Sequence, residues 1–337
     1  MSSNEDPHAS ANKQIYEVSS NSILHERAQQ YYWEGLAPLS IKTFFGGRAL
    51  YTLGKGYYAV NDASYLIVNQ NQPYAITIEA SQNVESFCLF FEPGLAEEVY
   101  RSLITPTRDL LDSPEPDRII PLHFFERTYR HGDLVSPLLL SLRARLSRGN
   151  YEQAWLDERF HELLQQLLQV HLNVYKEVET LSALRASTRQ ELYRRLYRAR
   201  EYAIAYLERP VTLREMAMVA ELSPNHFMRM FRHLFRQTPH QFLIQQRIER
   251  ARTLLTTTDL TVTEISLSLG FESMGSFSWL FHQRVGCSPT AYRTKKSDFR
   301  EAHLSFLCHT HPQIEPTYML KEMIYGEKSC PRSNPGQ

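Results

Sequence analysis

Residues 212–239 read TLREMAMVAELSPNHFMRMFRHLFRQTP, and residues 261–289 repeat the pattern as TVTEISLSLGFESMGSFSWLFHQRVGCSP. The offset between equivalent residues is 49 before the internal turn, from Thr212 to Thr261, and 50 after it, from Phe227 to Phe277. An added residue in the second turn accounts for the change. We name these segments the first copy and the second copy. A duplicated pair of short helices around a tight turn is typical of paired helix-turn-helix units.

The first copy carries local signals for both of its helices. Thr212 is an N-cap with Glu215 three residues on, which is the capping-box pattern. Ser223 is a second N-cap, and Pro224 stands at the first helical position, where its missing N–H costs nothing. The three- and four-residue spacing of the apolar side chains predicts an inward face. That face comprises Phe227, Phe231, Leu234 and Phe235, and the outward residues are Asn225, His226, Met228, Arg229, Arg232 and His233.

The second copy follows the same plan. Thr261 or Thr263 opens it, Gly270 makes the turn and Ser273 restarts the helix. The residues expected to face outward are Met274, Gly275, Ser278, Trp279, His282 and Gln283. Between the copies, residues 239–255 predict one helix of about 25 Å, which would act as a stiff spacer.

Residues 286–293, GCSPTAYR, together with Ile265, Gly270, Phe277 and Phe281, resemble the signature of AraC/XylS-type transcriptional regulators. The resemblance covers about 100 residues. It implies two helix-turn-helix units that place their second helices in successive major grooves of double-stranded DNA. The residues that it assigns to base contacts are Asn225, Met228, Arg229, Met274, Gly275, Ser278 and Trp279, and the phosphate contacts are Arg232, Arg236, His282 and Arg284.

The second copy departs from the family pattern in its outward residues. Trp279 stands where an arginine is common, and Met274 and Gly275 lack strong hydrogen-bonding groups. We therefore expect the first copy to supply most direct base readout, with Arg229 binding guanine O6 and N7. The second copy would contribute position and shape fit.

Charge is distributed unevenly along the chain. The 37 Lys and Arg residues balance the 37 Asp and Glu residues, so the formal net charge is zero. Residues 210–296 nevertheless contain eleven basic and six acidic residues, a net charge of +5. The candidate DNA-binding face thus keeps a positive field.

The sequence predicts an α+β multidomain protein. We expect a disordered start at 1–20, a linker at 178–187, the double helix-turn-helix domain at 188–296 and a flexible tail at 297–337. For residues 21–177 the family resemblance implies a cupin-like sensing and dimerisation domain. Short runs rich in aromatic and β-branched residues predict the strands of a β-barrel. They are residues 41–44, 56–60, 65–68, 74–78 and 85–91, with a turn at 80–83, and a proline-rich connection is expected at 105–121.

A cupin-like barrel suggests two uses, sensing and catalysis. No histidine occurs between His25 and His123, which disfavours a metal-dependent cupin enzyme, and no other cofactor is implied. The alternatives to a regulator are a non-metal cupin-type enzyme and a protein-binding adaptor. The candidate residues for binding an effector are Arg48, Tyr51, Tyr57, Tyr58, Tyr65 and Tyr74, although aromatic side chains at alternate strand positions also commonly fill a core.

Helices are expected at 134–146 and 151–174, and the second has a wide apolar stripe. The family resemblance implies a homodimer interface there, and packing onto the barrel is the alternative. The residues concerned are Leu156, Phe160, Leu163, Leu164 and Leu167. A basic helix at 188–207 would either touch phosphate or present a solvated face.

Several other features narrow the class of protein. There is no run of apolar residues long enough for a membrane span and no signal-peptide core at the start, so we expect a cytoplasmic protein. The four cysteines show no disulfide framework, and the tail residues Cys308, His309, His311 and Cys330 match no structural-zinc pattern. We expect a regulator, an activator that contacts RNA polymerase, responding to a small-molecule or protein effector.

Overall fold

The structure is a computed structural model that describes residues 14–15, 19–112, 121–147, 149, 152–181 and 185–294. The predicted start and the central residues of the predicted linker lie largely outside this set, and the predicted tail lies wholly outside it. The chain divides into two compact units. The first contains the sheet, the helices up to Ala205 and residues Thr212–Thr238, and the second contains Tyr206–Val211 and the chain from Pro239 onward. The predicted domain boundaries stay predictions.

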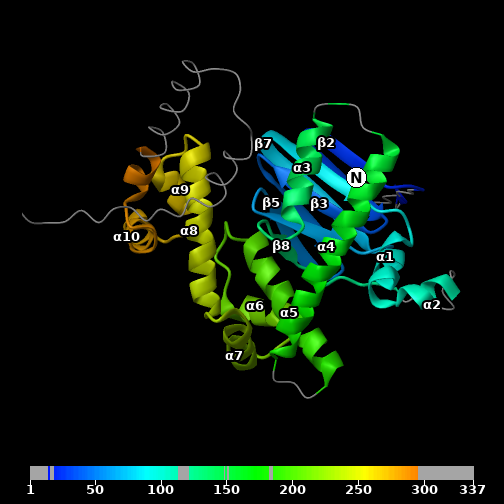
Figure 1. Ribbon diagram of the computed structural model, residues 1–337. Helices are drawn as coiled ribbons and strands as arrows, with labels where there is room; N and C mark the ends of the chain where they lie inside the picture. The colour runs from blue at the N-terminus through cyan, green and yellow to red at the C-terminus, as the bar shows by residue number, and fades with distance from the viewer. Residues whose placement is uncertain are drawn as a thin grey trace, which may run out of the picture. The chain divides into compact units, whose positions relative to one another are not determined.

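The elements are labelled in chain order (Figure 1). The strands are β1 (Gln14–Ile15), β2 (Ser22–Leu36), β3 (Ser40–Phe45), β4 (Arg48–Leu53), β5 (Gly56–Asn61), β6 (Ser64–Val68), β7 (Pro73–Phe90) and β8 (Thr128–Arg130). The helices are α1 (Leu95–Ile104), α2 (Thr107–Asp112), α3 (Ser136–Leu146), α4 (Gln153–Glu179), α5 (Ala186–Ala205), α6 (Leu213–Val219), α7 (Pro224–Phe235), α8 (Pro239–Thr257), α9 (Val262–Ser268) and α10 (Met274–Val285).

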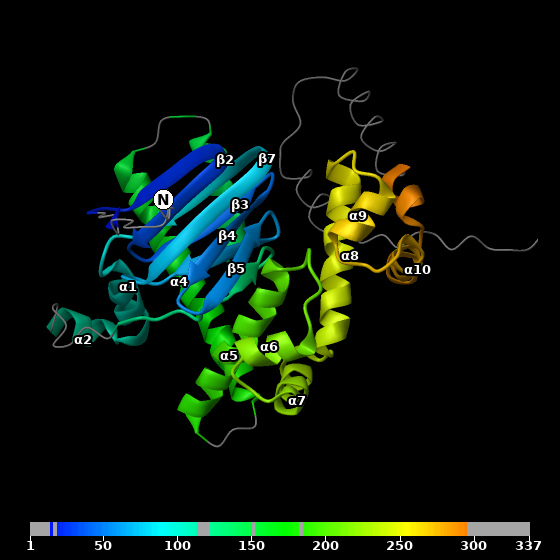
Figure 2. The same ribbon diagram turned by 180° about the vertical axis from the view of Figure 1, so that it is seen from behind.

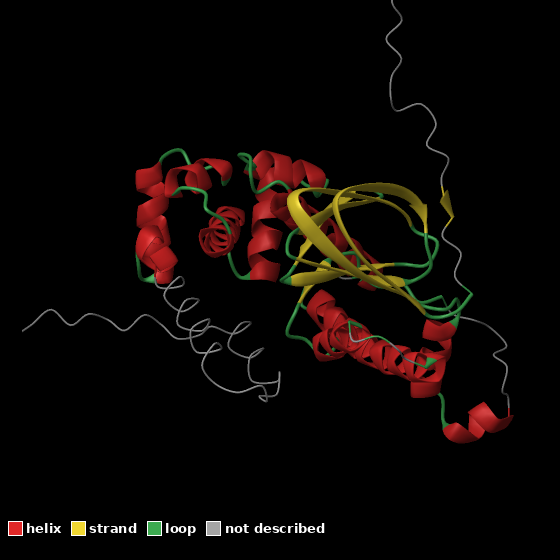
Figure 3. Cartoon of the chain, turned by 90° about the horizontal axis from the view of Figure 1, so that it is seen from above, coloured by secondary structure: helices red, strands yellow, loops and turns green. Residues whose placement is uncertain are grey.

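Strand β7 is the centre of the sheet. It runs antiparallel to β2 along nearly its whole length, to β4 over its first half and to β3 over its second half. Strand β6 continues beyond β3, β8 continues beyond β6, and β5 pairs with β4. Seen from above, the strands curl toward a closed ring (Figure 3). The predicted barrel followed by an all-helical region is therefore confirmed.

Alternate side chains of the strands point into the barrel and form its core, as the two-residue period of a strand requires. Helices α3 and α4 lie across one face of the sheet, and the opposite view shows the other face (Figures 1 and 2). Arg143 of α3 is tied to the sheet by two hydrogen bonds to the Glu85 carboxylate, at 2.6 and 3.0 Å. Phe160 of α4 packs edge-on against Phe91, with ring centres 5.1 Å apart.

Three details of the predicted secondary structure were wrong. The segments 74–78 and 85–91 belong to one strand, β7, and β2 pairs with both of them. The register shifts between Ala28, which pairs with Val84, and Gln30, which pairs with Glu79, so residues 80–83 form an irregularity within β7. Strands β2, β4 and β8 were not predicted, since the many exposed polar side chains of β2 hide its pattern. The expected proline-rich connection contains helix α2.

Both copies form the predicted helix pairs. Thr212 and Ser223 cap α6 and α7, as expected. In the second copy Thr261, rather than Thr263, caps α9, and Ser273 caps α10. The capping signals were sufficient to locate these helix starts because each acts within four residues.

Candidate nucleic-acid interface

The first copy builds its helix-turn-helix from its own caps and a small aromatic core. The Thr212 hydroxyl accepts a hydrogen bond from the Glu215 N–H at 3.2 Å, and the Glu215 carboxylate accepts one from the Thr212 N–H at 2.8 Å. Phe227 and Phe231 are fully buried, with ring centres 5.3 Å apart. This arrangement fixes which side of α7 faces outward.

The outward side of α7 presents the residues predicted to contact DNA. Asn225, Met228 and Arg229 are exposed, as are Arg232 and Arg236. Helix α7 contains no acidic residue. Within the described part of the chain, no hydrogen bond or ion pair occupies these three guanidinium groups. They are therefore available to an external anion or base edge.

An open groove of about 1210 Å³ runs beside this arginine face. Arg229, Arg232 and Arg236 of the α7 segment contribute to one side of it. Residues of the first turns of α5, including Ser187 and Thr188, contribute to the other. Basic and hydroxyl side chains together are groups that bind phosphate oxygens in protein–DNA complexes.

The second copy presents a different surface. Met274 and Trp279 are 49% and 62% exposed, and Gly275 is also exposed, whereas Ser278 is half-buried. The predicted phosphate contacts His282 and Arg284 are exposed. The outward face of α10 is thus more apolar than that of α7.

Helix α8 belongs to the second unit and packs against the second copy. Its buried residues join the core of α9 and α10, in which Phe277 and Phe281 are fully buried. Arg252 of α8 donates a hydrogen bond to the Tyr292 hydroxyl at 3.1 Å. Arg293 donates to the carbonyl oxygen of Leu255 at 3.2 Å. The predicted spacer therefore also acts as a wall of the second copy.

The turn of the first copy is linked to the barrel through Glu221. The Lys55 ammonium, at the β4–β5 turn, lies 2.6 Å from the Glu221 carboxylate. Arg195 and Arg198 of α5 approach the same carboxylate at 3.6 and 3.8 Å. The hydrogen bond from Lys55 lowers the pKa of the Glu221 carboxyl group. Sequence reasoning missed this contact, because Lys55 and Glu221 are 166 residues apart.

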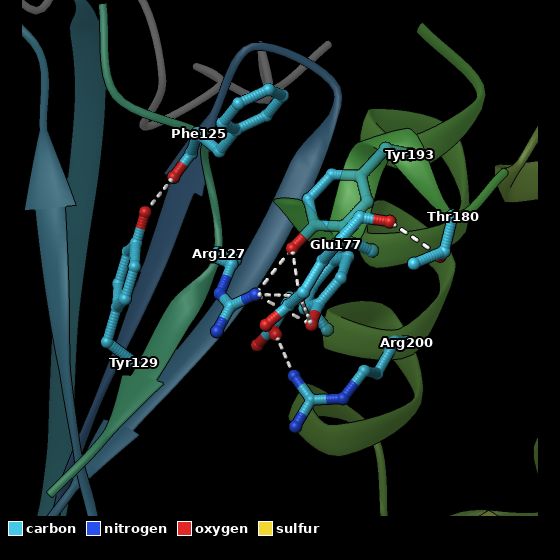
Figure 4. Close-up of polar contacts among 9 residues, drawn as sticks. Phe125, Arg127, Tyr129, Glu177, Thr180, Tyr193 and Arg200 are labelled. Carbon is cyan, nitrogen blue, oxygen red and sulfur yellow. Dashed lines mark hydrogen bonds and ion pairs between the residues drawn. The ribbon is translucent and has the colours of Figure 1, made fainter. Parts of the chain in front are cut away.

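A second link joins α5 to the segment before β8 (Figure 4). Arg127 donates hydrogen bonds to the Tyr193 hydroxyl, to the Tyr197 hydroxyl at 2.7 Å and to the Glu177 carboxylate at 2.9 Å. The Tyr193 hydroxyl donates to the same carboxylate at 2.7 Å, and burial raises the pKa of Tyr193. This network connects α4, α5 and the barrel around a single guanidinium group.

The predicted effector residues do not form one site. Tyr51 and Tyr74 border a small cavity inside the barrel. Tyr65 is buried against Tyr129, its hydroxyl donating to Asp133. The remaining three residues do not border this cavity. Tyr58 is buried, and its hydroxyl lies 3.5 Å from the Glu126 carboxylate. Tyr57 is 38% exposed, and Arg48 is half-buried. Lys42, which also borders the cavity, was not singled out from the sequence.

The apolar stripe of α4 is buried within the chain itself. Its side chains are at most 1% exposed at Leu156, Phe160, Leu163, Leu164 and Leu167. Intramolecular packing, the alternative left open by the sequence, accounts for this burial. A dimer interface at these residues stays a prediction.

Other expected features can be located only in part. Among the described residues, no group of three or more His, Cys, Asp or Glu side chains is placed to hold a metal ion, and Cys308, His309, His311 and Cys330 lie outside them. Cys88 is a buried free thiol, and Cys287 is half-buried. No helix in the described ranges is long and apolar enough to cross a membrane.

Comparison with known proteins supports the assignment of the helical region. A family profile described as a helix-turn-helix domain matches residues 216–295. A protein of Photobacterium leiognathi described as the probable transcriptional regulator LumQ is 28% identical over 171 residues, 50% of this chain and 64% of the relative. The melibiose operon regulatory protein of Escherichia coli (strain K12) is 31% identical over 94 residues, 28% of this chain and 31% of the relative.

A solved structure of the DNA-binding domain of AdpA, in complex with a target DNA, is 33% identical, with a TM-score of 0.31, and the match covers 32% of this chain and 96% of that domain. The chain spans less than two thirds of the length of the two curated relatives. The duplicated, capped helix pairs and the matching profile cover the same residues. This chain therefore carries, at residues 216–295, a helix-turn-helix domain of the AraC/XylS type.

Proposed function

We propose that this protein is a sequence-specific DNA-binding transcriptional regulator. The observation that carries the proposal is the set of exposed, unoccupied arginines on the outward face of α7. Arg229 would read guanine through O6 and N7, aided by Asn225 and Met228. Arg232 and Arg236, with His282 and Arg284 of the second copy, would hold phosphates.

Selection of bound sequences from random double-stranded DNA, followed by a salt titration, tests this function. We expect an enriched motif and an affinity that falls as salt rises. Arg229→Ala should remove about 1–3 kcal/mol of discrimination at one base position. Arg130→Ala, which removes an exposed arginine of β8, serves as the control and should change neither affinity nor motif. Unchanged affinity and base preference in Arg229→Ala would refute the assignment of the recognition face.

We further propose that the barrel receives an effector and passes its influence to the first copy. Two contacts could transmit an effect from the barrel to the first copy. They are the Lys55–Glu221 ion pair and the hydrogen bonds of Arg127 to α5 and α4. Helix α5 packs against both α6 and α7, so a shift of α5 would reposition α7. Arg127→Leu should leave a folded protein whose DNA affinity no longer responds to the effector.

We propose an activator role through contact with RNA polymerase and a homodimeric assembly. Transcription in vitro from a promoter carrying the selected motif should rise on addition of the protein and should not rise with Arg229→Ala. Analytical ultracentrifugation with and without DNA tests the dimer. Because the α4 stripe is buried within the chain, Leu163→Ala should lower stability, and it should weaken the dimer as well if this stripe reaches the interface.

A further inference from the structure

The barrel interior contains a lysine that has no anionic partner among the described residues. Lys42 lies on β3 in register with Cys88 of β7, and it is 2% exposed. Its ammonium lies 3.7 Å from the centre of the Phe90 ring and 5.2 Å from that of Tyr74. The aromatic faces attract the cation but do not neutralise it.

The groups that face Lys42 do not supply a negative charge. Burial raises the pKa values of the Cys88 thiol and the Tyr51 hydroxyl, so both are neutral near pH 7. Glu26 borders the same cavity, but its side chain is exposed to water. It pairs with Ser86, whereas Lys42 pairs with Cys88, the next inward-facing residue along β7. The residues level with Lys42 on the neighbouring strands carry no carboxylate. They are Cys88 of β7, Leu24 of β2 and Leu66 of β6.

Burial lowers the pKa of Lys42 to about 8, so the ammonium form still predominates at neutral pH. A buried cation without a counter-ion is unfavourable, because it has lost its hydration shell. An anion supplied from outside the chain would restore the lost electrostatic stabilisation. The buried ammonium group of Lys42 therefore indicates that a ligand of this cavity would be negatively charged.

The cavity beside Lys42 has a volume of about 60 Å³ and mainly aromatic walls. Trp33 and Tyr74 form one side, with ring centres 4.8 Å apart, and Tyr51 stands next to Tyr74 at 5.6 Å. Such walls take a short hydrocarbon or aryl group. A phosphate would require several donors, whereas a carboxylate is matched by one ammonium group.

We propose that this cavity is the effector site and that it takes a small monocarboxylate, whose carboxylate pairs with Lys42 and whose apolar tail lies among Trp33, Tyr51 and Tyr74. The inference rests on the proposed effector role of the barrel and adds the chemical class of the ligand. Residues of β2, β3, β4 and β7 line the site. These four strands run side by side in the sheet that Figure 2 shows. A ligand there would bridge the part of β7 that pairs with β4 and the part that pairs with β3.

The test titrates the full-length protein with acetate, butyrate, hexanoate and benzoate, and with the primary amide of each acid. Trp33 in the cavity wall reports occupancy by its fluorescence, and thermal unfolding gives an independent measure. We expect at least one acid to bind saturably and to raise the unfolding temperature. The matching amide, which has the same size but no charge, should bind at least about tenfold more weakly.

Two lysine variants locate the site. Lys42→Met keeps the length of the chain and removes the buried charge, so it should retain or raise thermal stability while losing at least about tenfold in acid affinity. Lys176→Met removes a lysine that is exposed on α4, away from the cavity, and should bind the acids as the wild type does.

Three results would overturn the proposal: no saturable binding of any of the acids, equal binding of acid and amide, or unchanged acid binding by Lys42→Met. The comparison of acid with amide on the wild-type protein decides the question even if Lys42→Met does not fold. DNA binding without ligand is measured on the same preparation. Its presence without an acid response would reject the ligand class and leave the proposed regulator function standing.

Discussion

The two copies share a backbone path but differ at the positions where that path is left-handed. Glu221 and Arg236 of the first copy have φ of 54° and 56°, and their counterparts Gly270 and Gly286 have φ of 70° and 83°. A left-handed conformation costs a residue other than glycine about 1–2 kcal/mol. The first copy accepts this strain at two side chains to which we assign contacts, Glu221 to the barrel and Arg236 to phosphate. In the first copy, the two left-handed residues are therefore the ones to which we assign contacts outside the copy.

The second helices of the two copies, α7 and α10, also differ in the side chains that they expose. Helix α7 displays arginines and no acidic residue, whereas α10 exposes Met274 and Trp279. Arginine discriminates bases by paired hydrogen bonds, and apolar side chains recognise mainly shape and the thymine methyl group. The side chains of the first copy are thus suited to hydrogen bonding with base edges, and those of the second copy to recognising the shape of the groove.

We expect the largest effect from removing one buried phenylalanine from the core of each copy, because the two copies belong to different compact units. Phe227→Ala and Phe277→Ala remove equivalent, fully buried rings, and each should cost about 3–5 kcal/mol of unfolding free energy. Because residues 212–238 share a compact unit with the barrel, Phe227→Ala should lower the barrel's unfolding midpoint, while Phe277→Ala should spare it. Denaturant titration followed by Trp33 and Trp279 fluorescence, each with the other tryptophans replaced by Phe, measures this. Equal shifts at both probes for both variants would contradict the division.

The next effect concerns base readout by the second copy. Trp279→Arg places a guanidinium group at an exposed position of α10 and should create about 1–3 kcal/mol of preference for guanine at one site. The motif selected from random DNA should gain one defined position. Trp279→Phe is the matched control and should leave the motif as it was. A motif unchanged by the arginine would mean that this face of α10 does not reach base edges.

Exchanging the left-handed residues should shift stability in opposite directions. Gly286→Ala should destabilise the second copy by about 1–2 kcal/mol, although no other atom lies near the added methyl group. Arg236→Gly should stabilise the first copy by up to about the same amount. If Arg236 contacts phosphate, the same change should reduce the logarithmic salt dependence of DNA binding by about 0.9. Thermal unfolding and salt titration on both variants give the two readings, and stabilisation with an unaltered salt slope would remove Arg236 from the interface.

The smallest expected difference lies in the caps. Thr212→Ala and Thr261→Ala each remove a threonine that closes a capping box, at a cost of about 1 kcal/mol. The hydroxyl-to-backbone distance is 3.2 Å in both, so the two losses should agree closely. Thr→Ser at either position retains the acceptor and controls for the methyl group. A much larger loss at Thr212 would show that the barrel unit depends on that cap.

Prediction from the sequence succeeded where the signal is local. The caps at Thr212 and Ser223, the turn at Gly270 and the inward rings Phe227 and Phe277 act over three or four residues, so their spacing alone specifies the helices. It failed where pairing decides conformation. Residues 74–78 and 85–91 belong to the one strand β7 because β2 pairs with the chain on both sides of the irregularity at residues 80–83, and no spacing within β7 itself reveals that pairing.

The sequence by itself determined the duplicated helix pairs and the basic face of α7, because caps, turns and helical periodicity are properties of neighbouring residues. Only the tertiary structure decided that Lys42 is enclosed by aromatic rings, that Glu221 meets Lys55 and that Arg127 joins α4 to α5. These contacts join residues up to 166 positions apart. Burial and charge pairing depend on which distant segments the fold brings together, and that information is not contained in any short stretch of chain.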